Sequence, residues 1–255
     1  MMNNSQKSDK KIEFNGKLIR YTLKFIGRII LFGSVLILYI LDREWITEFL
    51  SKPFTFFGIT PLHIVWGVFM CIMLFHLLPA KTQQRTMAWL KMKEDIYKPV
   101  DNYDELKLLK YVQDQNKKAW TVMLVWLSFN AFWAFLYLND IIKESELFLL
   151  SAFYFLSDYI CILIYCPFQS NIMKNKCCVN CRIYDWGHFM MFTPMLFIKN
   201  FFCWSLFFTS LVVLIKWEIT YTKYPERFWE GSNQNLKCIN CKDKTCQYKK
   251  QYQNI

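Results

Sequence analysis

The chain has 255 residues, of which 54% are hydrophobic and 19% aromatic, and its formal net charge is +11. Several apolar runs approach the roughly 20 residues that a helix needs to cross a bilayer, and they lack the polar residues at helical intervals that a water-facing helix shows. Only 7 Gly and 7 Pro interrupt the chain, which favours long helices over short strands. The composition therefore excludes an ordinary soluble domain and predicts an all-α, polytopic integral membrane helical bundle.

The distribution of the positive charge is more informative than its sum. Lys and Arg are concentrated in some segments between the apolar runs and are sparse in others, which is typical of membrane orientation. No nucleic-acid-binding motif accompanies the bases. We therefore expect membrane lipids as the partners of the charged face, with a protein partner at the cytoplasmic face as a further option, and no nucleic acid.

The chain begins with a basic segment, residues 1–21, which we expect to be cytoplasmic. A cleaved signal peptide has a shorter basic region and a small-residue cleavage site, and residues 42–45 after the first apolar run offer no such site. Residues 22–78 are expected to form the first two transmembrane helices, at about 22–41 and 55–78.

Residues 119–168 are expected to form the third and fourth transmembrane helices, at about 119–141 and 147–168. The turn between these two helices, residues 139–146, carries one base and three acids, and residues 42–54 carry two bases and three acids. Because bases accumulate on the cytoplasmic side, both acidic turns are expected outside. The predicted location is the cell membrane, with the N-terminus in the cytoplasm.

Residues 79–118 are expected to form a basic cytoplasmic helical segment. Nine Lys and Arg residues lie between Lys81 and Lys118. The run Asp101-Asn102-Tyr103-Asp104-Glu105 after Pro99 is typical of a helix start, and apolar residues at helical spacing continue from it into the third span. We expect a helical hairpin lying against the membrane surface, with a partner-binding arm as the alternative.

The fifth apolar segment, residues 189–217, has an ambiguous length. It exceeds one span but falls short of the roughly 40 residues that two spans need. A single crossing would place the basic tail, residues 218–255, outside the cell. The charge of the tail therefore favours a re-entrant hairpin with Lys199 and Asn200 at its tip, and an interfacial helix at 189–198 followed by one short span is the alternative.

Two Cys-x-x-Cys motifs flank this segment, one in a cytoplasmic Cys-rich segment, residues 169–188, and one in the tail. Each motif is followed by a base, Arg182 or Lys242, which favours the thiolate form. Two such pairs can present four thiolates to one tetrahedral ion, and a hairpin would bring them to the same face. We predict a metal site formed by Cys178, Cys181, Cys238 and Cys241, with Cys177 and Cys246 as alternates.

The expected metal is zinc in a structural role, with an iron–sulfur cluster as the alternative, since coordination preferences alone do not separate them. The predicted function is accordingly a multi-pass membrane protein whose zinc supports a lipid- or partner-binding role. The alternative is a membrane redox protein with an iron–sulfur centre or a thiol–disulfide exchange pair. No catalytic motif occurs, so no catalytic residue is predicted. The lone Cys71, Cys161 and Cys203 are expected to be packing residues.

Two polar residues are expected at membrane depth, Asp158 in the fourth span and Lys199 at the tip of the hairpin. An intramembrane carboxylate is costly and usually functional. Lys199 is the partner that we expect for Asp158, with Ser157 or water as alternatives.

Overall fold

The computed structural model describes residues 16–51, 59–77, 91, 94–175, 177–178, 180–240, 246 and 249. Within these ranges the chain is helical and contains no strand, and an isolated bridge joins Pro99 to Asn233. Four helices are long and apolar enough to cross a membrane, namely α1 (Gly16–Leu41), α5 (Glu105–Leu138), α6 (Glu144–Leu163) and α8 (Phe201–Lys223). The predicted all-α bundle of membrane-spanning length is therefore confirmed.

The four long helices differ in one respect from the four predicted spans. α1, α5 and α6 correspond to the spans predicted at 22–41, 119–141 and 147–168, whereas the fourth long helix, α8, comes from the fifth apolar segment. The second predicted span appears as α3 (Pro61–Leu77), which has 17 residues. Residues 59 and 60 precede this helix without regular structure, and residues 55–58 and 78 lie outside the described residues.

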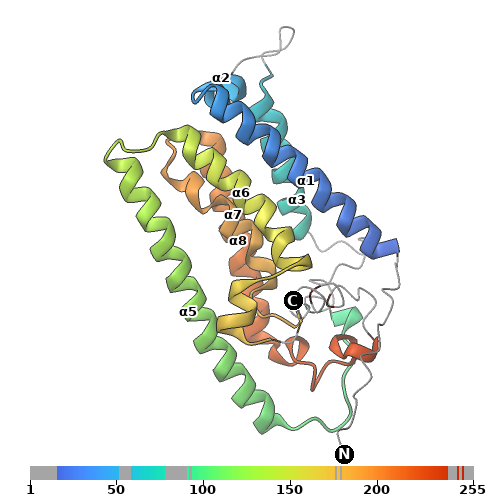
Figure 1. Ribbon diagram of the computed structural model, residues 1–255. Coiled ribbons are helices and arrows are strands. Elements are labelled where there is room, and N and C mark those ends of the chain that lie inside the picture. The colour runs from blue at the N-terminus through green and yellow to red at the C-terminus, as the bar shows by residue number, and fades with distance from the viewer. Residues whose placement is uncertain are drawn as a thin grey trace, which may run out of the picture.

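The helices alternate in direction along the chain (Figure 1). α1 is antiparallel to α6, because Arg28 pairs with Asp158 while Tyr39 near the end of α1 donates to Glu146 near the start of α6. α3 packs along α8 and is parallel to it, because Trp66 near its start donates to Ser205 and the carbonyl of Leu77 at its end accepts from Lys216. The bundle thus has a turn end, which carries residues 42–44 and 139–143, and a cysteine-rich end, which carries residues 164–186 and 224–240.

α5 begins where the sequence predicted a helix start. The Asp104 side chain caps it by accepting a hydrogen bond from Lys107 N at 3.1 Å. Its 34 residues form one continuous helix, about 51 Å long at 1.5 Å per residue. The second part of the basic segment, from residue 105, and the predicted third span therefore belong to one continuous helix. Most of the first arm of the predicted hairpin, residues 79–90 and 92–93, lies outside the described residues.

Short helical pieces connect the long helices. The turn end carries α2 (Trp45–Ser51), and the cysteine-rich end carries the π-helix η2 (Phe168–Met173) and the 3-10 turn η3 (Tyr184–Trp186). α7 (Gly187–Phe192) and η4 (Thr193–Phe197) form the first arm of the fifth segment. The remaining 3-10 turns are η1 (Glu94–Ile96), η5 (Pro225–Phe228), η6 (Gln234–Leu236) and η7 (Cys238–Asn240).

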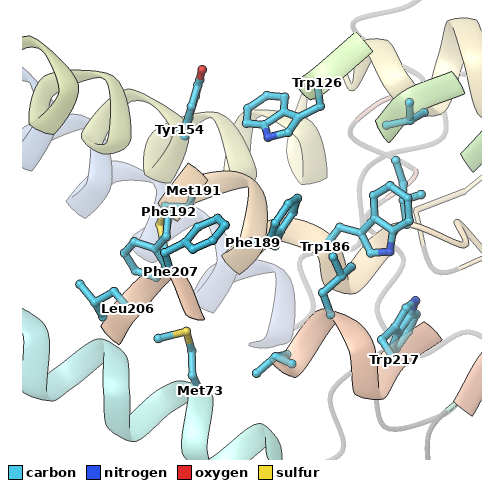
Figure 2. Packing of buried hydrophobic residues seen from close by; sticks show 14 of the residues in the cluster. Met73, Trp126, Tyr154, Trp186, Phe189, Met191, Phe192, Leu206, Phe207 and Trp217 are labelled. Carbon is cyan, nitrogen blue, oxygen red and sulfur yellow. The ribbon is translucent and has the colours of Figure 1, made fainter. Parts of the chain in front are cut away.

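The hydrophobic core is centred on the short helix α7 (Figure 2). Phe192 of α7 meets Phe69 of α3 edge to face, with ring centroids 5.2 Å apart. Phe189 packs against Phe207 of α8. Burial of such aromatic side chains contributes most of the packing energy of a small bundle, so the first arm of the fifth segment is an integral part of the core.

The outer faces of α1 and α5 are apolar and exposed. Ile30 and Ile40 of α1 and Leu124, Phe132 and Phe135 of α5 are each more than half exposed. Contiguous apolar surface on this scale is unfavourable in water and is what a lipid-facing helix requires. The exposed apolar faces and the lengths of the helices therefore both indicate that α1 and α5 cross a membrane.

Candidate functional site: a thiol centre at the cysteine-rich end

The fifth apolar segment folds back on itself and brings the tail to the cysteine-rich end. α7 and η4 lead toward the turn end, and α8 returns alongside them (Figure 1). Trp204 Nε1 of α8 donates to the Leu196 carbonyl of η4 at 3.1 Å, which holds the two arms together. Lys199 lies exposed between the arms. The segments that carry the two Cys-x-x-Cys motifs consequently lie at the same end of the bundle, as a shared metal site requires.

Cys178 is buried at this end and has a lysine against its sulfur. Nζ of Lys249 lies 2.7 Å from Cys178 Sγ and 2.6 Å from Oε1 of Gln169. The Cys178 thiol also lies within hydrogen-bonding distance of this oxygen, at 3.0 Å. Burial raises the pKa of Cys178, and the Lys249 ammonium opposes this effect. The tail therefore places a positively charged side chain, Lys249, against the Cys178 sulfur.

Cys177 and Cys181 are the other buried thiols of this segment. Cys181 closes a tight turn in which its N–H donates to the Cys178 carbonyl at 3.0 Å. Its own carbonyl accepts a hydrogen bond from Nζ of the fully buried Lys91 at 3.0 Å. Burial raises the pKa of Cys181 to about 11 and lowers the pKa of Lys91 to about 8. Burial thus disfavours the charged form of both groups.

The tail cysteines differ in position. Cys246 packs against the small cluster that Cys177 and Leu236 form, so one tail cysteine lies near the Cys-rich segment. Cys238 is exposed, and Cys241 lies outside the described residues. Over the part of the chain that the structure describes, no group of three or more His, Cys, Asp or Glu side chains is arranged to hold a metal ion. Zinc and the iron–sulfur cluster therefore remain predictions.

A second pair of thiols lies where the chain leaves α6. Cys161, expected to be a packing residue, lies close to Cys166, and its carbonyl oxygen accepts a hydrogen bond from Cys178 Sγ at 3.6 Å. Cys166 Sγ accepts a hydrogen bond from Gln169 N at 3.4 Å. The neighbouring thiol of Cys161 lowers the pKa of Cys166 to about 6, against the opposing effect of burial. Both thiols are partly exposed, unlike those at positions 177, 178 and 181.

Asp158 has a partner, but this partner is Arg28 of α1 and not the expected Lys199. Nη1 of Arg28 lies 3.0 Å from Asp158 Oδ2, and its guanidinium carbon lies 3.7 Å and 4.0 Å from the ring centroids of Phe155 and Tyr159. The expectation of a Lys199 pair was wrong because Lys199 lies at the turn between the two arms, whereas Asp158 lies near the cysteine-rich end of α6.

A histidine pair lies beside this ion pair. The rings of His76 and His188 meet edge to face with centroids 5.2 Å apart, and His76 Nδ1 lies 3.9 Å from Asp185 Oδ1. A Cβ added to the adjacent Gly187 would lie 3.3 Å from Asp158 Oδ1. The start of α7 is therefore packed closely against the polar side chains of α3 and α6.

Arg182, expected to favour the thiolate form of the neighbouring cysteines, instead ties its segment to α8. Its guanidinium pairs with both carboxylate oxygens of Glu218, at 3.2 Å and 2.5 Å. It also lies over the ring of Tyr221, with the guanidinium carbon 4.2 Å from the centroid. Trp217 Nε1 donates to the Arg182 carbonyl at 2.8 Å. These contacts fix the segment that carries Arg182 to α8.

Three residues of this end were missed by the sequence reasoning, namely Lys91, Gln169 and Lys249. Each is polar and nearly fully buried, but each lies in a segment whose composition is typical of an exposed loop. The proximity of Cys161 and Cys166 was only weakly indicated by the sequence. Two residues five positions apart lie close together only when a helix ends between them, as α6 does here. The proline at 167 marks that end.

Comparison with protein-family models, with curated proteins and with solved structures gave no match. The class of the protein therefore follows from its own geometry. Four long apolar helices with exposed apolar faces define a helical membrane protein.

Proposed function

We propose that this membrane protein carries a structural zinc ion at its cysteine-rich end, bound by Cys178, Cys181, Cys238 and Cys241. In this proposal the ion joins the tail to the segment after α6, and the basic cytoplasmic face of the protein binds anionic lipid. Cys177 and Cys246 are alternate ligands.

The observation that carries the proposal is the cation against Cys178. A lysine from the tail, Lys249, lies 2.7 Å from this buried sulfur. A buried sulfur that needs a positive partner is suited to a divalent ion, which converts the thiol to thiolate and offsets its charge. Zinc at this point would take the place of the Lys249 ammonium.

The positions of the two segments support the same proposal. Cys178 and Cys181 lie on one turn, and Cys246 of the tail packs against the cluster that contains Cys177. Asn180, inside the first motif, donates to Glu230 of the tail at 2.8 Å. Cys238 has to turn inward from its exposed position for the four thiolates to meet.

The lipid-binding part of the proposal rests on the first turns of α5. Lys107 and Lys110 are exposed there, and Leu106 and Leu109 beside them are 72% and 55% exposed. Exposed lysines interleaved with exposed leucines favour the boundary between anionic headgroups and acyl chains.

Metal analysis of the full-length protein, purified anaerobically in detergent, tests the zinc site. We expect about one zinc per chain, with a loss of zinc in the Cys178→Ser, Cys181→Ser, Cys238→Ser and Cys241→Ser variants. Cys71→Ser, on the exposed face of α3, is the matched control and should retain zinc. Wild-type protein that contains no zinc, or Cys→Ser variants that retain it, would contradict the proposal.

The second candidate function is redox, and one observation favours it. Nζ of Lys249 lies 2.7 Å from the Cys178 sulfur and opposes the rise in pKa that burial causes, and a neighbouring cation is a feature of reactive cysteines. A brown preparation that contains iron and sulfide would favour this alternative over zinc.

A further inference from the structure

We propose that His76 and His188 form a site for one exchangeable proton, and that this proton joins the end of α3 to the start of α7. The bound proton strengthens the docking of the first arm of the fifth segment, so this contact inside the bundle depends on pH. The inference depends neither on the zinc site nor on any cysteine.

The two histidines come from distant parts of the chain and meet ring to ring. His76 lies one residue before the end of α3, and His188 lies in the first turn of α7. Their rings meet edge to face with centroids 5.2 Å apart. At this separation a charge on one imidazole makes a charge on the other unfavourable. The pair therefore holds one proton rather than two.

An acid beside one of the rings determines where the proton resides. His76 Nδ1 lies 3.9 Å from Asp185 Oδ1, and the two side chains are only 26% and 12% exposed. A carboxylate at this distance favours the charged imidazolium, and partial burial strengthens the attraction. Asp185 belongs to η3, which directly precedes α7. A protonated His76 consequently forms an ion pair that joins α3 to the segment from which α7 begins.

The other charged groups around the pair come from α1, α6 and α8. Lys216 of α8 donates to the His76 carbonyl at 3.4 Å. On the side of His188, Asp158 of α6 and Arg28 of α1 are the charged neighbours, and these two are paired with each other at 3.0 Å. Among these residue types only histidine ordinarily changes its charge between about pH 5 and pH 8. The charge that varies in this neighbourhood is therefore that of the histidine pair.

The position of α7 gives the proton a structural effect. Phe192 of α7 packs against Phe69 of α3 at the centre of the core. A Cβ added to Gly187 would lie 3.3 Å from Asp158 Oδ1, so the start of α7 is already closely packed on the side of α6. Loss of the proton removes the ion pair toward α3. The docking of α7 on α3 therefore weakens as the pH rises through the titration of His76.

The first test is nuclear magnetic resonance of full-length protein in detergent with ¹⁵N-labelled histidine. The sequence contains three histidines, so single variants assign each imidazole signal. We expect His76 to titrate between about pH 5.5 and pH 8.5 and His188 to remain neutral over the same range. His76→Gln should move the titration of His188 to higher pH, because the neighbouring charge is gone. Asp185→Asn should move the titration of His76 to lower pH.

The second test is amide exchange at residues 187–192, corrected for the intrinsic effect of pH on exchange. We expect about fivefold faster exchange at about pH 8.5 than at about pH 5.5 in the wild type, and no such difference in His76→Gln or Asp185→Asn. Two variants keep the test decisive if one of them folds poorly.

His63→Gln is the matched control, because His63 lies on the same helix near its other end, where its ring accepts from Thr60 N at 3.1 Å. This variant should behave as the wild type in both tests. Zinc content measured on the same samples shows failure of the zinc proposal separately. A titration of His188 that is unchanged in His76→Gln, or wild-type exchange at residues 187–192 that does not depend on pH after correction, would overturn the inference.

Discussion

Arg28 of α1 and Asp158 of α6 form an ion pair in which Nη1 lies 3.0 Å from Oδ2. This pair joins the two helices. The Arg28 side chain is 19% exposed and the Asp158 side chain 39%. The Arg28 guanidinium also lies against the rings of Phe155 and Tyr159, so this contact combines charge with packing.

Replacing Asp158 by Asn should destabilise the bundle by about 2 kcal/mol, below the value for a fully buried pair because Asp158 is partly exposed. Thermal unfolding in detergent of D158N, R28Q and the double variant measures the coupling between the two residues. Lys143→Gln, which breaks the exposed Lys143–Glu44 pair, is the control and should change stability by less than about 0.5 kcal/mol. Additive effects of the two single changes would contradict a direct coupling.

Replacing Glu218 by Gln should loosen the Cys-rich segment from α8. The Arg182 side chain is 7% exposed and would lose its charged partner, at a cost of about 3 kcal/mol. Limited proteolysis between residues 177 and 186, followed by mass analysis, detects the loosening. Glu48→Gln, on the exposed part of α2, is the matched control, and equal cleavage in the two variants would be inconsistent with this role of Arg182.

Lys91 should make stability depend on pH at alkaline values. Burial lowers its pKa from 10.5 to about 8 in the folded protein, so between these values the unfolded chain binds more protons than the folded one. Stability therefore rises with pH across this window, by roughly 3 kcal/mol in total. Unfolding measured at pH 7.5 and pH 10 should show this rise in the wild type relative to Lys91→Met, and parallel curves would show that Lys91 does not cause it.

Replacing Asp104 by Ala should fray the first turn of α5, because the cap to Lys107 N is lost. The expected cost is about 1 kcal/mol, which corresponds to roughly fivefold faster amide exchange in that turn. Asp101→Ala, an exposed residue outside the helix, is the control. Unchanged exchange at residues 105–108 would argue against the cap.

The long helices and the start of α5 could be predicted from the sequence because local signals determine them. The Asp101–Glu105 run supplies a capping carboxylate, and apolar runs of sufficient length form helices wherever backbone polar groups must be satisfied internally. These features depend on residues that are close together in the chain.

The partners of the polar side chains could not be predicted, because they depend on how the helices pack. The sequence showed that Asp158 needs a cation, but Arg28 and Lys199 were both available, and only the direction of α1 against α6 selects Arg28. The burial of Lys91 and Lys249 has the same origin. Lys91 and Lys249 belong to strongly basic segments. Because basic side chains usually face water, the sequence did not indicate that these two lysines are buried.

The length of α5 gives this protein a lever. A bilayer core of about 30 Å accounts for some 20 of its residues, which leaves a rigid arm of about 20 Å toward the cysteine-rich end. A tilt of about 10° in the bilayer, well within the range of membrane helices, would move the tip of this arm by about 3 Å. Tyr111 on the arm stacks on Trp229 of the tail, with ring centroids 5.9 Å apart, so a change in bilayer thickness would be transmitted mechanically to the tail.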